Sequence, residues 1–201
     1  MSSKIARWML TSGLVLAVVA LVTVAGQAQE RERETFTGML AQMSGPAAGA
    51  TGTLMLTVDR WTTPEERQAY ISALADGGQD KLLDLMENAR GDQRNGFAKF
   101  PRTLGWDLTY AWHYMNGDKR VVVLATNRPV AFIEARNQFR TMDYPFGLIV
   151  LELDAKGEGL GVVYQAASAK FNKEGVLEIE SYGIGPQRLL SVRSKKETVK
   201  K

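Results

Sequence analysis

The chain has 201 residues, of which 45% are hydrophobic and 23% are charged, which fits one globular domain with processing segments. It contains no cysteine, and this excludes disulfides, thiolate catalysis, cysteine metal sites and a lipid-modified N-terminal cysteine. The formal net charge of +3 comes from the two ends, because the chain without Lys4, Arg7 and the tail 195–201 has a charge of −2. Nucleic-acid binding is therefore not expected, since it requires basic residues gathered on one face.

The N-terminal segment has the pattern of an export signal. Lys4 and Arg7 precede an apolar run over 14–26, and small residues follow up to Ala28. We predict a signal peptide over 1–28 and an exported protein, periplasmic or secreted, with no stable membrane insertion after cleavage. The alternative is an uncleaved N-terminal membrane anchor, because the apolar stretch 8–26 is just long enough to span a bilayer.

The remaining chain is predicted to be a single domain over 35–194. Residues 29–34 are expected to form a flexible charged leader, and 195–201 a basic disordered tail. Weak alternation over 35–43 and β-branched residues over 53–58 predict the first two strands.

Two helices are predicted next. Residues 63–66, Thr-Pro-Glu-Glu, form a capping box with proline at the first helical position. Gly77 and Gly78 are expected to end this first helix. Apolar residues at helical spacing predict a second helix over about 79–89.

Strands dominate the second half. Residues 106–115 alternate, Asn116-Gly117 predicts a hairpin turn, and 120–126 is apolar on both faces. Further strands are predicted over 147–154, 160–171, 176–182 and 188–193, joined mainly by short turns. The fold class is therefore α+β, with a curved antiparallel sheet or half-open barrel of roughly eight strands and an inserted pair of helices.

The sequence lacks the residues or motifs that several kinds of catalytic and nucleotide-binding site require. There is one histidine, His113, and neither a Gly-x-Ser-x-Gly elbow nor a phosphate-binding loop. The carboxylates at 152 and 154, and at 178 and 180, are spaced for one strand face, where pairs can bind calcium or hydrolyse glycosides. Their apolar neighbours favour a solvent-exposed face instead. No catalytic residue, metal site or cofactor is predicted, and the balance points away from an enzyme.

Four amphipathic aromatic residues share one face of the strand over 106–115. They form either part of the core or the lining of a ligand cavity, since tyrosine and tryptophan have polar groups that require partners when buried. The small residues 166–169 could leave space opposite them. The four are Trp106, Tyr110, Trp112 and Tyr114.

The polar connection 127–146 is the other candidate binding surface. Its arginines could clamp a carboxylate or phosphate, or they could pair with Glu134 and Asp143 and fasten the connection to the sheet. The residues of this candidate site are Arg128, Arg136, Asn137, Arg140 and Asp143.

Four short motifs resemble those of a group of short exported bacterial proteins without a characterised activity. The motifs are Asp59-Arg60-Trp61, Gly105-Trp106-Asp107-Leu108, Glu134-Ala135-Arg136-Asn137 and Asp143-Tyr144-Pro145-Phe146. The resemblance covers most of the chain after the signal and implies export and a single domain. It implies no activity, cofactor or site.

The sequence supports three functional hypotheses. The first is an exported, non-enzymatic binding protein for a small amphipathic or anionic ligand. The second is an envelope protein–protein interaction module without a ligand cavity, and the third is a hydrolase that uses carboxylates alone. The expected partner is thus a small molecule or an envelope protein.

Overall fold

A computed structural model describes residues 31–41, 49–88, 94–130, 143–182 and 185–199. Within these ranges it contains ten strands and one helix. The predicted signal peptide lies outside them. The elements are β1 (Arg31–Ala41), β2 (Thr51–Val58), α1 (Pro64–Glu87), β3 (Gly96–Lys99), β4 (Trp106–Leu108), β5 (Tyr110–Asn116), β6 (Lys119–Thr126), β7 (Phe146–Leu153), β8 (Glu158–Phe171), β9 (Leu177–Ser181) and β10 (Gln187–Val199).

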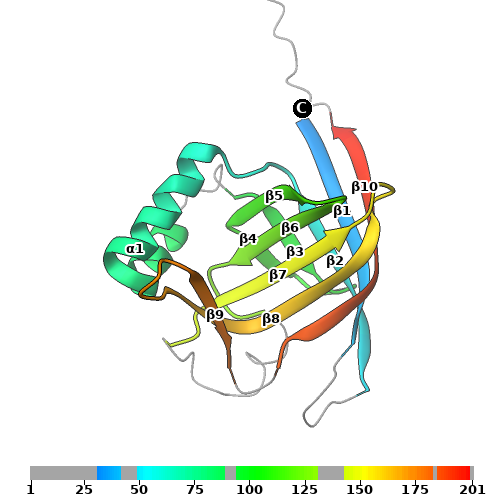
Figure 1. The fold of residues 1–201 in the computed structure, drawn as a ribbon. Helices are drawn as coiled ribbons and strands as arrows, with labels where there is room; N and C mark the ends of the chain where they lie inside the picture. The colour runs from blue at the N-terminus through cyan, green and yellow to red at the C-terminus, as the bar shows by residue number, and fades with distance from the viewer. Residues whose placement is uncertain (1–30, 42–48, 89–93, 131–142, 183–184, 200–201) are drawn as a thin grey trace, which may run out of the picture.

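The strands form one antiparallel sheet that curls into a half-barrel, with α1 on one side (Figure 1). The strand order is β4-β3-β2-β1-β10-β8-β7-β6-β5, and β9 pairs with β8 outside this order. The α+β class with a curved antiparallel sheet is thereby confirmed. The two end strands, β4 and β5, are separated in the chain by Thr109 alone, whose N–H donates to the Ala125 carbonyl of β6 at 2.9 Å.

The predicted number of about eight strands is wrong. One additional strand is β3, a four-residue segment too short to show a convincing alternation. The other arises because the predicted strand over 106–115 is divided at Thr109, where the chain stops pairing with β3 and begins pairing with β6.

The division at Thr109 also changes which face the side chains occupy. Leu108 and Ala111 are three residues apart, yet both are fully buried in the same core cluster. Uninterrupted alternation would place them on opposite faces. The single alternation predicted over 106–115 therefore fails at Thr109, because the chain shifts its alternation by one residue at the bend.

Both ends of the described chain lie in strands where a leader and a tail were expected. β1 begins at Arg31 and β10 continues to Val199, and these two residues are paired. Opposite charges meet across this pairing, since the Lys196 Nζ atom lies 2.9 Å from the Glu32 Oε1 atom. Charge complementarity between distant segments explains why this part of the sheet is difficult to recognise from either segment alone.

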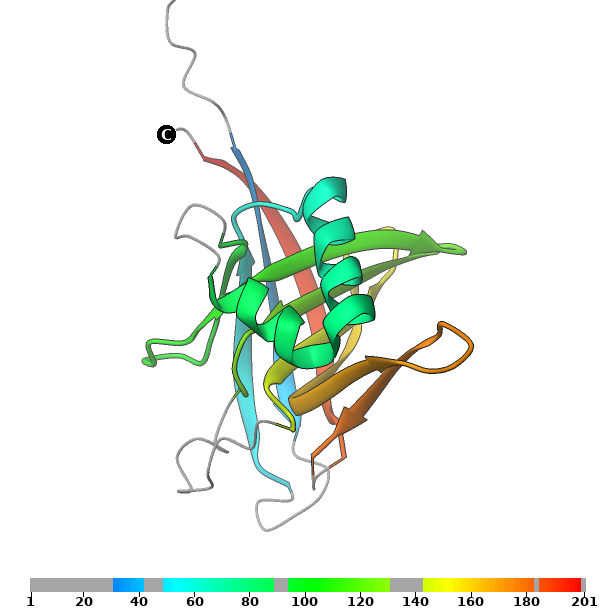
Figure 2. The ribbon, with the colours of Figure 1, turned by 90° about the vertical axis from the view of Figure 1, so that its left-hand side faces the viewer.

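The helix begins as predicted, but it is one helix where a pair was expected. The Thr63 hydroxyl accepts from the Glu66 N–H, and the Glu66 carboxylate accepts from the Thr63 N–H, so the capping box is present. Gly78 adopts φ 67° and ψ −163°, and this bends α1 at the predicted break without ending it. Figure 2 shows the two parts of α1 running in different directions in front of the sheet.

The interior of the curl is a filled apolar core. Strands from all round the sheet contribute fully buried side chains to one cluster. The largest are Phe36, Leu54, Leu56, Leu108, Leu124, Ile149, Leu151, Leu153 and Leu189. These side chains therefore fill the inside of the curl, and a ligand would have to bind elsewhere.

Candidate functional site

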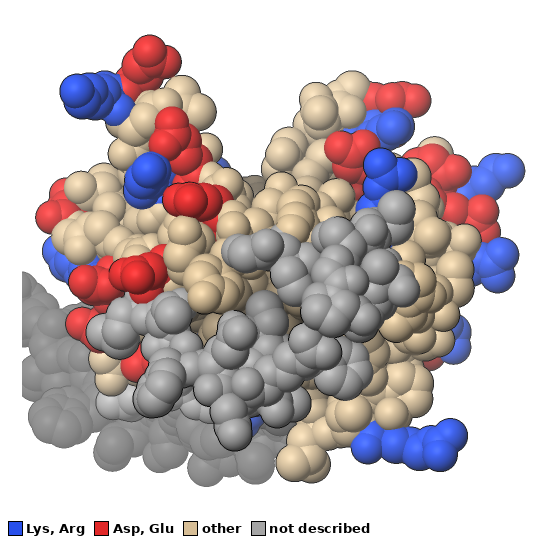
Figure 3. Space-filling view, turned by 90° about the horizontal axis from the view of Figure 1, so that it is seen from below, with Lys and Arg blue, Asp and Glu red and all other residues tan. Residues whose placement is uncertain are grey.

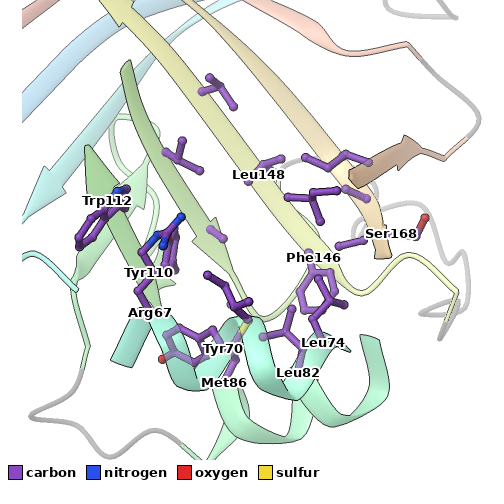
Figure 4. Close-up of a pocket in the computed structure, with 18 of the residues that line it drawn as sticks. Arg67, Tyr70, Leu74, Leu82, Met86, Tyr110, Trp112, Phe146, Leu148 and Ser168 are labelled. Atoms are coloured by element: carbon purple, nitrogen blue, oxygen red, sulfur yellow. The ribbon is translucent and has the colours of Figure 1, made fainter. Parts of the chain in front are cut away.

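A pocket of about 420 Å³ lies between α1 and the outer face of the sheet (Figure 4). We call it the α1 pocket. The helix contributes Arg67, Tyr70, Ile71, Leu74, Leu82 and Met86. The sheet contributes Tyr110, Trp112, Tyr114, Val123, Ala125, Phe146, Leu148, Val150, Ala167, Ser168, Ala169, Phe171, Leu177 and Ile179.

The floor of the α1 pocket follows from strands that are apolar on both faces. On β6, Val122 and Leu124 point into the core, so Val123 and Ala125 point outward beneath the helix. The small residues Ala167 and Ala169 of β8 fill little of the remaining space. The predicted gap at 166–169 thus lies opposite three of the predicted aromatic residues.

The roof is the apolar stripe of α1. Arg67, Tyr70, Ile71 and Leu74 are spaced at i, i+3, i+4 and i+7, which places all four on the face that meets the sheet. Tyr70 is held in place because its hydroxyl donates to the Thr109 carbonyl at 3.2 Å. The bend at Gly78 then lets the second part of the helix bring Leu82 and Met86 to the same pocket.

Arg67 gives the α1 pocket one positively charged end. Its guanidinium lies 5.2 Å from the centre of the Trp112 ring, a cation–π contact. Its positive charge also acts on Tyr110, where it opposes the effect of burial on the pKa of the phenol. The Nε atom of Arg67 is buried without a hydrogen-bond partner. Buried polar atoms normally have partners, so this end of the pocket is incompletely satisfied in the protein alone.

Two tyrosines beside Arg67 remain neutral hydrogen-bonding groups at physiological pH. Burial raises the pKa of Tyr70 and of Tyr110 above the ordinary value of 10.0. Their rings meet edge to face with centroids 5.9 Å apart. Both phenolic groups therefore keep their protons. Tyr70 donates its proton to the Thr109 carbonyl, and Tyr110 can donate to an acceptor in the pocket.

The opposite end of the pocket is open beside β9. Leu177 and Ile179 line the pocket and are still 48% and 38% exposed. Seen from below, the surface is hollowed between two projecting parts of the molecule, with mostly uncharged side chains between them (Figure 3). A ligand thus has an apolar route into the pocket past β9.

Three of the four predicted aromatic residues line the α1 pocket, and the fourth does not. Tyr110, Trp112 and Tyr114 all point towards the helix from β5. Trp106 precedes the bend at Thr109 and instead packs edge to face on Phe100, with centroids 5.9 Å apart. The alternation of the sequence identified the three correctly as one group, and the shift at Thr109 removes Trp106 from it.

Among the described residues of the connection 127–146, Phe146 alone lines this pocket. Arg128 donates to the Gly105 carbonyl at 3.1 Å, and so fastens the start of the connection to the chain before β4. Asp143 is exposed, and its carbonyl accepts from Gln79 of α1 at 3.2 Å. The other predicted residues of this stretch, Arg136, Asn137 and Arg140, lie outside the described residues.

The single histidine and the paired carboxylates lie away from the pocket. The His113 ring is exposed and packs edge to face on Trp61 at 4.5 Å. Glu152 lies 3.6 Å from Lys119 and Glu178 lies 3.7 Å from Lys170, both at the surface. Among the described residues no group of three or more acidic or histidine side chains could hold a metal ion. Nor does that part of the chain include a helix long and apolar enough to cross a membrane.

Arg67 is the important lining residue that the sequence prediction missed. The signal was present, because Arg67 has the same helical spacing as Tyr70, Ile71 and Leu74 and so belongs to the apolar face. Leu177 and Ile179 of β9, the apolar neighbours of the carboxylates at 178 and 180, also line the pocket.

Comparison with known proteins gives no relative from which a function could be transferred. No protein-family model, curated protein or solved structure matches the chain.

Proposed function

We propose that this protein is an exported, non-enzymatic binding protein that holds a small amphipathic ligand in the α1 pocket. The observation that carries the proposal is the cavity itself, whose volume of about 420 Å³ falls within the range of roughly 300–1,000 Å³ typical of ligand sites. The N-terminal pattern of charged, apolar and small residues supports export.

The chemistry of the lining supports binding over catalysis. The twenty lining residues are mainly apolar and aromatic, and none of them is a carboxylate, histidine or lysine. The polar groups that do occur are suited to orienting a ligand: one guanidinium, the tyrosine hydroxyls, the Trp112 indole and the Ser168 hydroxyl. A hydrolase that uses two carboxylates would need such groups in the cleft. In the described structure Glu152 and Glu178 pair with lysines at the surface, and Glu180 accepts from the Tyr144 hydroxyl.

The test uses a pocket-filling variant and a matched control. Val123→Phe places a large side chain in the floor of the pocket, whereas Val162→Phe makes the same change on β8 outside the lining. Anilinonaphthalene sulfonate, a dye that fluoresces in apolar sites, is titrated into each protein. We expect the wild-type protein to bind the dye at one site per molecule. Val123→Phe should bind the dye at least about tenfold more weakly, and Val162→Phe should bind it as tightly as wild type. Equal binding by all three proteins would refute the pocket as the site.

Native mass spectrometry of the protein purified from its own source is the complementary test. A co-purifying small molecule that is absent from the Val123→Phe variant would identify the natural ligand. Binding proteins that retain their ligand through purification should show a defined added mass. A bare polypeptide at every yield would count against the proposal.

A second candidate function is protein interaction through β9. In the described structure β9 pairs with β8 alone. The side chains of Leu177 and Ile179 on β9, and of Val176 just before it, are between 38% and 55% exposed. An apolar edge strand is suited to pairing with a strand of another protein. A photo-crosslinker at Val176 should then yield one discrete envelope protein, which Leu177→Asp should abolish. Capture of no discrete partner would exclude this candidate.

A further inference from the structure

On the basis of the proposed binding function, we infer that the ligand of the α1 pocket is a single-chain monocarboxylate. Its carboxylate would lie at Arg67, and its hydrocarbon chain would run between α1 and the sheet towards β9. The inference depends on three features of the pocket: one unneutralised cation, the geometry of that cation, and the apolar path leading away from it.

Arg67 is the single charged side chain among the lining residues, all of which are described. No carboxylate pairs with it in the described structure, and its guanidinium lies over the Trp112 ring. Its Nε is buried and unpartnered. A cation in a largely apolar pocket is stabilised by an anion more than it would be in water, because the local dielectric is lower. The pocket is therefore complementary to a negatively charged group.

The geometry favours a carboxylate over a phosphate. A guanidinium presents a planar fork of donors that fits the two oxygens of a carboxylate. Tyr110 lies next to Arg67 in the lining (Figure 4), and its hydroxyl is a further donor. One arginine neutralises one negative charge. A dianionic phosphate would bring a second charge into a pocket whose lining has no other cation, and an uncompensated buried charge is costly.

The apolar part of the lining indicates that the remainder of the ligand is a hydrocarbon chain. Figure 4 shows Arg67, Tyr110 and Trp112 at one side, Ser168 at the other, and Phe146 and Leu148 between them. Apart from Ser168, the walls beyond the Arg67 end are aliphatic or aromatic as far as Leu177 and Ile179 of β9. An unbranched hydrocarbon chain buries its surface along such a path and needs no further polar partner.

The experiment compares probes that share one chain and differ in the head group. Dodecanoate, dodecanol, dodecyl phosphate and dodecyltrimethylammonium are titrated calorimetrically into the mature protein at neutral pH. We expect dodecanoate to bind at least tenfold more tightly than dodecanol, and the other two probes to bind more weakly than dodecanoate. Equal affinity for dodecanoate and dodecanol, or tighter binding of dodecyl phosphate, would overturn the inference.

Arg67→Met tests the role of the guanidinium. Methionine keeps an apolar stem of similar length, so the helix face remains packed. We expect this variant to bind dodecanoate and dodecanol equally, with the affinity for dodecanol unchanged from wild type. Arg188→Met, at an exposed site on β10, should leave the preference for dodecanoate intact. A preference that survives in Arg67→Met would overturn the assignment of Arg67. If Arg67→Met fails to fold, Arg67→Gln serves in its place.

Failure of the inference and failure of the proposed function give different results. If dodecanol binds as well as dodecanoate and Val123→Phe abolishes both, the pocket binds apolar chains and only the carboxylate assignment is wrong. If no dodecyl compound binds and Val123→Phe does not change dye binding, the proposed function fails as well.

Discussion

Arg120 of β6 donates from both terminal nitrogens to the two carboxylate oxygens of Glu34 of β1, with N–O distances of 2.7 and 2.9 Å. These strands are not neighbours in the sheet, so the pair links them across the interior of the curl. Glu34 is only 2% exposed and also accepts a hydrogen bond from the Ser194 hydroxyl of β10. Three strands are thus joined through one buried carboxylate.

Removing the charge of Glu34 should destabilise the fold strongly. Glu34→Gln leaves the Arg120 guanidinium without its anion in a mostly buried position, and we expect the free energy of unfolding to fall by about 3 kcal/mol. Urea denaturation of both proteins measures this loss. Replacing both partners, as Glu34→Leu with Arg120→Met, should be less destabilising than Glu34→Gln, because no buried charge is left unpaired.

The control for this prediction is an exposed ion pair. Lys119 lies 3.6 Å from Glu152 with more than half of both side chains in solvent. Lys119→Met should change the free energy of unfolding by less than about 1 kcal/mol. Similar losses for Lys119→Met and Glu34→Gln would show that the interior pair has no special role.

The pH dependence of stability should report the same carboxylate. Burial by itself raises the pKa of Glu34, but the hydrogen bonds from Arg120 and Ser194 and the nearby positive charges outweigh it, so the pKa lies below its ordinary value of 4.5. A lowered folded-state pKa means that the stabilisation is complete above about pH 4.5 and is lost as the pH falls through the folded-state value.

We therefore expect the free energy of unfolding to decrease below pH 4.5, with a shallower slope in Glu34→Gln than in wild type. Some slope should remain in the variant. The hydrogen bond from Arg60 also lowers the pKa of Glu66, which acts in the same direction. Urea denaturation at several pH values measures both slopes, and identical slopes would contradict the prediction.

Gly96 should tolerate no side chain. Its φ is +151°, and a Cβ atom there would lie 1.9 Å from the Thr57 carbonyl oxygen on β2. Gly96→Ala must therefore separate β3 from β2 as well as strain the backbone, and we expect a loss of at least about 3 kcal/mol in unfolding free energy. Gly185→Ala is the matched control, because nothing lies within 4 Å of its Cβ position. Thermal melting of both variants distinguishes the two cases.

Deleting residues 195–201 tests whether the basic C-terminal segment is part of the sheet. β10 pairs Lys195 to Val199 with Thr35 to Arg31 of β1, so the deletion exposes the edge of β1 and removes the contact between Lys196 and Glu32. We expect the melting temperature to fall by at least about 4 °C. Deleting 200–201 alone serves as the control. An unchanged melting temperature after the longer deletion would support the disordered tail that the composition suggests.

Local sequence patterns predicted the parts of the fold that depend on neighbouring residues. The capping box at Thr63 and Glu66 and the hairpin after Asn116 appear where they were expected, whereas Gly78 bends the helix and does not end it. Each is decided within four or five residues by hydrogen bonding or backbone conformation. Pairings between distant segments, such as β1 with β10, have no comparable local signal.

The candidate site shows the same limit. Alternation alone grouped Tyr110, Trp112 and Tyr114, and these residues do line one pocket. Alternation could not show that the pocket lies outside the curl, because the sequence of β6 is apolar on both faces and does not say which face the helix covers. The inclusion of Trp106 failed at Thr109, where the change of pairing partner shifts the alternation.

The sequence by itself determined the capped start of the helix and a curved sheet of antiparallel strands, because these follow from capping residues, alternation and turn residues along short stretches. Only the tertiary structure decided which strands close the interior, and where a cavity remains. The interior fills because large side chains from all round the sheet converge there, whereas beneath α1 the small residues Ala125, Ala167 and Ala169 leave space. Arg67 becomes the charged end of that space only because α1 crosses this face of the sheet.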